Sequence, residues 1–163
     1  MNCYSPLSEV RAIAERPDRR LAIDLFIAFS RLEYALKRIG YGRVNKQGVF
    51  EVNWEAYNYG ALPKFPSGGP IEQALKLFSL SPPLKQTGVK KWGQDNSTEP
   101  LGPKRLFVLV RRVRNNLFHG GKSPDDPTEL SRNSDLMSAS LHVIDWLLES
   151  DVQLRSAFIE GLD

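Results

Sequence analysis

The fold class is decided by one stretch of sequence, KRLFVLVRRVRNNLFH, which spans residues 104–119. Leucine and valine recur in it three or four positions apart, which is the spacing of one face of an α-helix. These apolar positions are Leu106, Leu109, Val110, Val113 and Leu117. We therefore expect a helix from Lys104 to Phe118, and the pair Gly120-Gly121 is expected to end it.

The same helix carries a dense group of cations with no acid among them: Lys104, Arg105, Arg111, Arg112 and Arg114. A basic cluster on one element is typical of a phosphate binder. Charge alone favours the simpler interpretation of a solvated face, because the net charge of the chain is only +3. A second stripe of Phe107, Arg111, Arg114 and Phe118 has apolar ends and a cationic middle, and it predicts a self-association surface.

Helical periodicity extends to both sides of this stretch. A first helix is expected from Pro17 to Ile39, with Gly40 as its stop. Its core stripe is Leu21, Leu25, Ala28, Leu32, Ala35, Leu36 and Ile39. A thinner stripe of Ile23, Ile27 and Tyr34 lies on the far side, so this helix is expected to touch two neighbours, one of which could be another subunit. Further helices are expected over Ile71–Leu80, Thr128–Glu149 and Asp151–Ile159.

Two segments between the helices lack such periodicity, residues 41–70 and 84–103. In the first, Val49 to Val52 could be a short strand or an extended segment, and Asn53 could cap a short helix through Tyr59. The second reads as a long irregular loop whose Trp92 could stack a nucleic-acid base or pin the loop to the body. The prediction is an all-α bundle, one domain over residues 1–163, with two loop-rich insertions.

Composition places the chain among ordinary globular proteins, with 41% hydrophobic and 25% charged residues. Its one cysteine, Cys3, excludes a disulfide framework and a cysteine-based zinc site. Two histidines and no acidic cluster at ligand spacing make another metal site a poor expectation. No run has the length of a signal peptide or a membrane span, so a cytoplasmic protein without membrane contact is expected.

An arginine and a histidine near one helix end suit phosphodiester transfer. The imidazole of His119 has an unperturbed pKa near neutrality, so it can take or deliver a proton at working pH. The guanidinium of Arg114 stays charged and can bind two phosphoryl oxygens at once. RNA supplies its own nucleophile, the 2′-hydroxyl. These two side chains would make a minimal ribonuclease that needs no metal and no cofactor.

The segment Arg114-Asn115-Asn116-Leu117-Phe118-His119 resembles the Arg-x4-6-His signature of the HEPN superfamily, including the polar residue after the arginine. A second segment, FSRLEYALKRIGY at residues 29–41, is similar to an early helix of many members. The resemblance covers these two helices and the helical order of the chain. It does not cover the 41–70 and 84–103 insertions.

The resemblance implies a HEPN-like bundle that forms a homodimer, with the Arg-His pair of each subunit in a shared cleft. Active members are endoribonucleases, often toxins or defence effectors, that leave a 2′,3′-cyclic phosphate. By carry-over, Arg114 would stabilise the phosphorane, His119 would be the general acid or base, and Asn115 would position them. RNA is the expected partner, with an antitoxin or regulatory protein as another. Residues expected to contact RNA are Arg111, Arg112, Asn116 and Lys122.

Two other functions stay open at this point, since some HEPN members have no nuclease activity. The chain could be a noncatalytic module that binds a partner protein or a nucleotide, or a helical binder of nucleic acid. Glu33 falls on the apolar side of the first helix, where a carboxylate is costly unless paired. It would support the site by meeting Arg114, or else lie at the rim in water.

Overall fold

The computed structural model describes residues 19–89, 91–118 and 127–160. The expected residues Pro17, Asp18, His119 and Lys122 lie outside these ranges. The helices of the described chain are α2 (Arg19–Arg38), α3 (Gly69–Leu80), α4 (Pro103–Phe118), α5 (Pro127–Ser150) and α6 (Val152–Ile159). The five helices predicted from periodicity are therefore present, and their ends differ from the prediction by one or two residues at the described positions.

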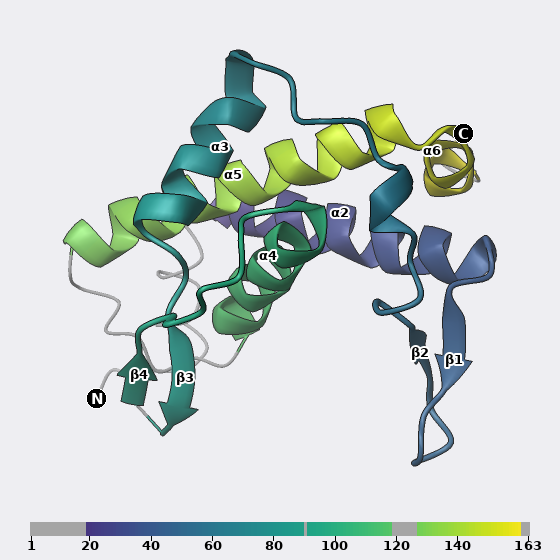
Figure 1. The fold of residues 1–163 in the computed structure, drawn as a ribbon. Coiled ribbons are helices and arrows are strands. Elements are labelled where there is room, and N and C mark those ends of the chain that lie inside the picture. Colours follow the sequence, from purple (N-terminus) through teal and green to yellow (C-terminus); the bar gives the residue numbers. More distant parts are fainter. Residues whose placement is uncertain (1–18, 90, 119–126, 161–163) are drawn as a thin grey trace, which may run out of the picture.

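The longest helix, α5, is the centre of the bundle, because it contacts α2, α3, α4 and α6. Figure 1 shows α4 in front of α2, with two β-hairpins projecting from the same side of the helical body on either side of α4. The inner faces of the helices form one apolar core. On α5 it includes Leu136, Ala139, Val143, Trp146 and Leu147.

Helix α2 ends two residues before Gly40, the glycine that was expected to stop it. Gly40 has a φ of +100°, a left-handed conformation that glycine adopts without steric cost. The backbone N–H of Tyr41 then donates to the carbonyl of Leu36 at 2.9 Å, which satisfies one of the carbonyls left unpaired at the helix end. The predicted core stripe is buried at Leu25, Leu32, Ala35 and Leu36, while the outer stripe of Ile23, Ile27 and Tyr34 is exposed.

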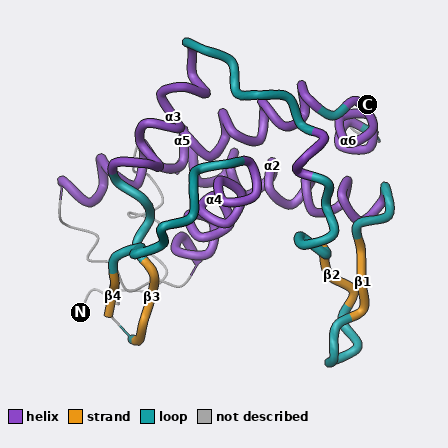
Figure 2. Tube along the Cα trace, in the orientation of Figure 1, coloured by secondary structure: helices purple, strands orange, loops and turns teal. Residues whose placement is uncertain are grey.

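The two insertions are not irregular, and the all-α prediction is wrong there. Each contains a two-stranded antiparallel sheet, β1 (Gly42–Val44) with β2 (Phe50–Val52) and β3 (Lys85–Gly88) with β4 (Lys91–Gly93). Figure 2 shows these strands as the two hairpins outside the helical body. Strands of three or four residues with polar side chains show no clear alternation, so main-chain pairing forms them without a sequence signal.

The first hairpin explains why Asn53 does not start a helix. Its backbone N–H donates to the carbonyl of Tyr41 at 2.7 Å, which continues the strand contact beyond β2. A turn follows, and the only regular structure before α3 in this part of the described chain is the 3₁₀ helix η1 (Tyr59–Ala61). The short helix that Asn53 could have capped is therefore absent, and of the two alternatives for Val49 to Val52 the structure has the short strand, β2.

The second stripe of α4 contacts its own chain at three positions, so only part of it is exposed for the self-association that was predicted. Phe107 is buried, with its ring centroid 6.0 Å from that of Tyr59. Arg111 lies over an aromatic ring of the 41–70 insertion and Arg114 lies over a ring of α2. The side chain of Phe118 lies outside the described residues.

Within the described ranges, none of the helices combines the length and the apolar character needed to cross a membrane.

Candidate functional site: two arginines on an aromatic pair

Arg114 lies just before the last turn of α4, at the contact with α2. Its Nη2 lies 3.5 Å from Oε2 of Glu33, and its Nη1 donates to Oδ1 of Asn115 at 2.9 Å. Its guanidinium carbon lies 5.1 Å from the ring centroid of Phe29. The Arg114 side chain is nevertheless 32% exposed. The predicted contact with Glu33 is thus present, and it leaves part of the guanidinium open to solvent.

Phe29 belongs to an aromatic pair that carries a second arginine. The ring of Phe29 stacks on that of Trp54 with centroids 5.7 Å apart and an angle of 29° between their planes. Arg111, one turn before Arg114, lies with its guanidinium carbon 4.9 Å from the centroid of Trp54. Each arginine therefore lies over one ring of the pair, an arrangement that favours a cation. We call Arg111, Arg114, Glu33, Phe29 and Trp54 the arginine site.

The two guanidinium groups are close enough to influence one another. Burial lowers the pKa of Arg111, and the charge of Arg114 lowers it too, while Tyr59, Glu33 and Glu55 act in the opposite direction. An arginine stays protonated even so, because its ordinary pKa lies far above neutrality. Glu33 thus attracts both cations, although only Arg114 lies within ion-pair distance of it.

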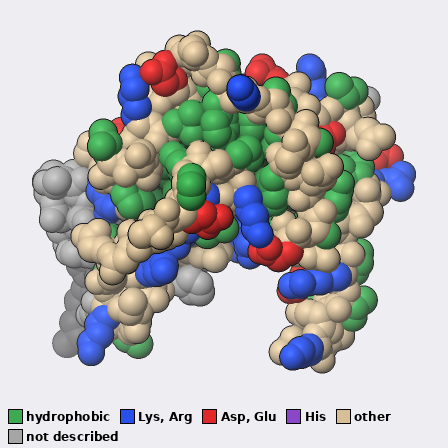
Figure 3. Space-filling model, in the orientation of Figure 1, with side chains coloured by type: hydrophobic (Ala, Val, Ile, Leu, Met, Phe, Trp, Pro, Cys, Tyr) green, Lys and Arg blue, Asp and Glu red, His purple; other side chains and the backbone are tan. Residues whose placement is uncertain are grey.

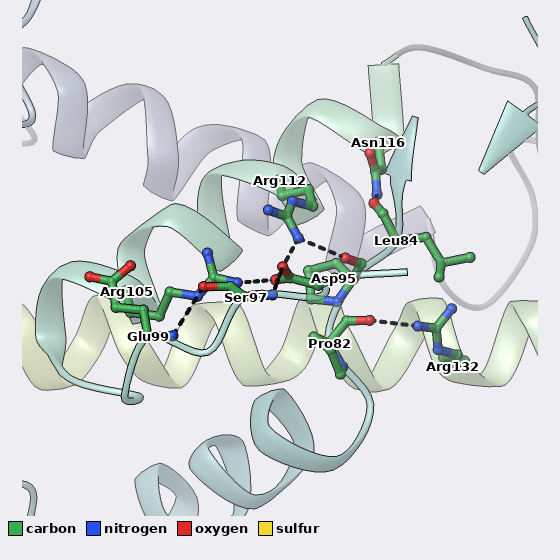
Figure 4. A network of polar contacts seen from close by, with 10 residues as sticks. Pro82, Leu84, Asp95, Ser97, Glu99, Arg105, Arg112, Asn116 and Arg132 are labelled. Carbon is green, nitrogen blue, oxygen red and sulfur yellow. Dashed lines mark hydrogen bonds and ion pairs between the residues drawn. The ribbon is translucent and has the colours of Figure 1, made fainter. Parts of the chain in front are cut away.

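The other arginines of α4 have a structural role that the sequence did not predict. Arg105 and Arg112 both contact Oδ2 of Asp95, Arg112 at 2.8 Å, and the Asp95 side chain is only 2% exposed (Figure 4). Burial raises the pKa of the Asp95 carboxyl, but hydrogen bonds from Arg112 and the Ser97 backbone, with the charges of both arginines, outweigh burial and lower this pKa overall.

Figure 4 shows further contacts that join the part of the chain before α4 to that helix. Arg112 also donates to the carbonyl of Pro83 at 3.1 Å, and Nδ2 of Asn116 donates to the carbonyl of Leu84 at 2.9 Å. These two residues were predicted to contact substrate. Their polar groups hold Pro83, Leu84 and Asp95 against α4, where two main-chain carbonyls and one carboxylate need donors.

The structure thus brings together Arg114, Asn115, Arg111 and Glu33 from the predicted set, and it separates Arg112 and Asn116 from them. The predicted catalytic His119 and the predicted RNA contact Lys122 lie outside the described residues. His119 directly follows Phe118, the last residue of α4, four positions after Asn115.

Sequence reasoning missed Trp54 and Asp95. Trp54 lies in a segment without periodicity, and nothing local marks a tryptophan that will lie under an arginine. Asp95 did carry a signal, since it is the one acid among residues 84–98 and it precedes a helix rich in arginine. A lone carboxylate beside an acid-free basic helix is a reasonable candidate for its ion-pair partner.

Lysine and arginine also gather on the two hairpins beside α4, where the space-filling view shows a hollow between them (Figure 3). Lys85 and Lys91, the first residues of β3 and β4, lie at opposite ends of the hairpin and are exposed, and neither forms an ion pair with another described residue. On the other side, Arg43 pairs with Glu51 at 2.9 Å and Lys104 pairs with Glu55. The β3–β4 hairpin is therefore the more strongly positive of the two.

Comparison of the chain with protein-family models, with curated proteins and with solved structures finds no match. Function is therefore argued from the site alone.

Proposed function

We propose that this chain is a metal-independent endoribonuclease of HEPN type that cleaves RNA by attack of the 2′-hydroxyl. The observation that carries the proposal is the state of Arg114, which is held by Glu33, Asn115 and Phe29 and remains one-third exposed. A restrained but accessible guanidinium suits a group that must meet a phosphoryl oxygen in a set geometry.

In the proposed reaction, His119 removes the proton of the 2′-hydroxyl or delivers a proton to the leaving 5′-oxygen. The 2′-oxygen forms a bond to phosphorus while the bond from phosphorus to the 5′-oxygen breaks, which leaves a 2′,3′-cyclic phosphate and a 5′-hydroxyl. Arg114 binds the phosphoryl oxygens as charge grows on them. Asn115 accepts a hydrogen bond from Arg114 and thereby limits its rotation.

The proposal includes a homodimer in which two arginine sites and two histidines share one cleft. Two such pairs would supply both the acid and the base that the reaction needs, since one His119 per chain can hold only one of these roles at a time. The RNA strand would extend over the cationic side chains of the β3–β4 hairpin. A cytoplasmic toxin or defence effector with a regulatory partner is the biological role that fits such an enzyme.

The test is RNA cleavage in the presence of EDTA by the wild type and by Arg114→Ala, His119→Ala and Arg155→Ala. Arg155 is exposed on α6, away from α4, and serves as the matched control. We expect cleavage with cyclic-phosphate ends by the wild type and the control, and loss of cleavage in both site variants. Absence of cleavage in a folded, RNA-binding wild type would exclude the enzyme.

The alternative function is a noncatalytic module that binds a partner protein or nucleotide through the same arginines. The observation in its favour is that Glu33 already neutralises part of the arginine site, as expected where binding rather than catalysis is required. A plain nucleic-acid binder is a third outcome, and it predicts RNA affinity that falls steeply with salt without any cleavage. If expression of the wild type inhibits growth and His119→Ala relieves this inhibition, the enzyme is favoured over both the noncatalytic module and the nucleic-acid binder.

A further inference from the structure

The segment between the first hairpin and α3 contributes one side chain to the arginine site. Trp54 follows β2 by two positions and lies between Phe29 of α2 and Arg111 of α4. We propose that Trp54 is a positioning residue that keeps Arg111 away from Glu33 and so keeps Arg114 in place. This inference rests on the proposed ribonuclease function for its effect on catalysis, whereas its effect on the arginines stands without it.

The first step of the argument is competition between two cations for one carboxylate. Arg111 and Arg114 are three positions apart on α4 and so lie on the same side of the helix. Glu33 attracts both, but its Oε2 lies within 4 Å of Arg114 only. A second guanidinium that reached Glu33 would displace the first or share its hydrogen bonds, because a carboxylate has few well-placed acceptor positions.

The second step is the restraint on Arg111. Its guanidinium carbon lies 4.9 Å from the centroid of Trp54, and Arg111 is partly buried. A cation over the face of an indole is the strongest pairing of this type, and it strengthens where water is excluded. Trp54 therefore supplies Arg111 with an alternative to Glu33, and this alternative is lost when the indole is removed.

The third step is the support beneath Arg114. Trp54 stacks on Phe29, and Phe29 is the ring over which Arg114 lies. Phe29 is buried in the core, so its own position is determined by the side chains that pack on both sides of its ring. Loss of Trp54 would remove one of those sides and change the surface on which Arg114 rests. Loss of Trp54 would therefore change the orientation of Arg114 in two ways, through the release of Arg111 and through the altered packing of Phe29.

A group aligned before reaction contributes to rate chiefly through kcat, because the geometry needed in the transition state is already present. We expect Trp54→Leu to lower kcat roughly ten- to a hundredfold with little change in KM. Trp54→Phe keeps a ring under Arg111 and should retain most of the rate. Phe65→Leu is the control, since Phe65 also contacts a tryptophan, Trp146, with ring centroids 4.6 Å apart in a tilted arrangement, and is also partly buried.

The direct readout is the side-chain Nε–H signals of Arg111 and Arg114 in an NMR spectrum of the protein without RNA, assigned with Arg111→Lys and Arg114→Lys. We expect Trp54→Leu to move both signals and Trp54→Phe to preserve them. Adding Arg111→Gln to Trp54→Leu should return the Arg114 signal part of the way, because the competing cation is gone while Phe29 still lacks the support of Trp54. Trp54→Met replaces Trp54→Leu if that variant does not fold.

Unchanged signals in Trp54→Leu would overturn the proposal, as would equal changes in Phe65→Leu, which would indicate general loosening of the core. A wild type that does not cleave RNA would refute the proposed enzyme, yet the arginine signals would still decide whether Trp54 positions Arg114. Altered signals with an unchanged kcat in a cleaving protein would show that the positioning has no catalytic consequence and would also overturn the inference.

Discussion

Nη2 of Arg114 and Oε2 of Glu33 lie 3.5 Å apart, and this contact joins α4 to α2 where the candidate site is formed. Both side chains are about one-third exposed, with values of 32% and 30%. An ion pair at that exposure stabilises a fold by at most about 1 kcal/mol. Its main effect is therefore to orient Arg114 rather than to hold the two helices together.

Glu33→Gln should separate binding from catalysis. We expect the free energy of unfolding to fall by less than about 1 kcal/mol, because the lost pair is partly solvated. RNA affinity at low salt should rise, since one negative charge leaves the site, while cleavage should slow as Arg114 loses its anchor. Urea unfolding, RNA titration and cleavage rates measure the three effects.

The control for that variant is Glu72→Gln on α3, which breaks a comparable ion pair with Lys76 at 3.0 Å, away from the arginine site. It should change neither RNA affinity nor cleavage. If Glu33→Gln behaves like Glu72→Gln in both assays, Glu33 has no part in the site.

Asn115→Ala should impair cleavage less than Arg114→Ala does. The amide oxygen of Asn115 accepts one hydrogen bond from Arg114 at 2.9 Å, so its loss leaves the guanidinium present but less restrained. A net hydrogen bond of this kind is worth about 0.5–1.5 kcal/mol, which corresponds to roughly a two- to tenfold fall in rate. Cleavage rates at saturating RNA measure the change. A loss as large as that of Arg114→Ala would mean that Asn115 itself contacts the substrate.

Asp95→Asn should destabilise the fold strongly. It leaves Arg105 and Arg112, both nearly buried, without their counter-charge, and removal of one partner from a buried ion pair costs about 3–5 kcal/mol. Denaturant unfolding near neutral pH measures this. Asp135→Asn, at an exposed position of α5, is the control and should be neutral.

The same carboxylate predicts a pH dependence. The folded pKa of Asp95 is lowered, so its contribution to stability is present above its unfolded pKa, about 3.9, and is lost as pH falls through the lower folded pKa. The wild type should therefore lose stability below about pH 4, and Asp95→Asn should show a shallower loss in that interval. Parallel acid profiles for both proteins would contradict this account of the network.

The β3–β4 hairpin should contribute phosphate contacts. Replacement of Lys85 and Lys91 by Gln removes two exposed cations, so the slope of log affinity against log salt for single-stranded RNA should fall in magnitude by about 1.4. The double variant Lys64→Gln/Lys76→Gln is the control, because it removes two exposed cations that belong to neither hairpin. Equal slopes in the two variants would place the RNA elsewhere.

The helices could be predicted from sequence because their signal is local. The apolar spacing in α4 and α5, the left-handed Gly40 after α2 and the glycines before α3 depend on neighbours within a few positions. The contact between Glu33 and Arg114 could also be predicted, since an acid on an apolar helix face needs a cation as partner and α4 is rich in arginine. The HEPN resemblance and the roles of His119 and Lys122 stay predictions.

The hairpins pair short strands that are neighbours in the chain, and such strands hold too few residues for alternation to identify them. The burial of Phe107 and the contacts of Arg112, Trp54 and Asp95 were decided by tertiary structure alone. These contacts join separate segments and leave no periodic trace in either segment. Arg111, Arg112 and Arg114 look alike in the sequence. Only the arrangement of α2, α4 and the two insertions distinguishes them. Arg112 pairs with a buried aspartate, Arg111 lies over an indole, and Arg114 is partly exposed beside Glu33.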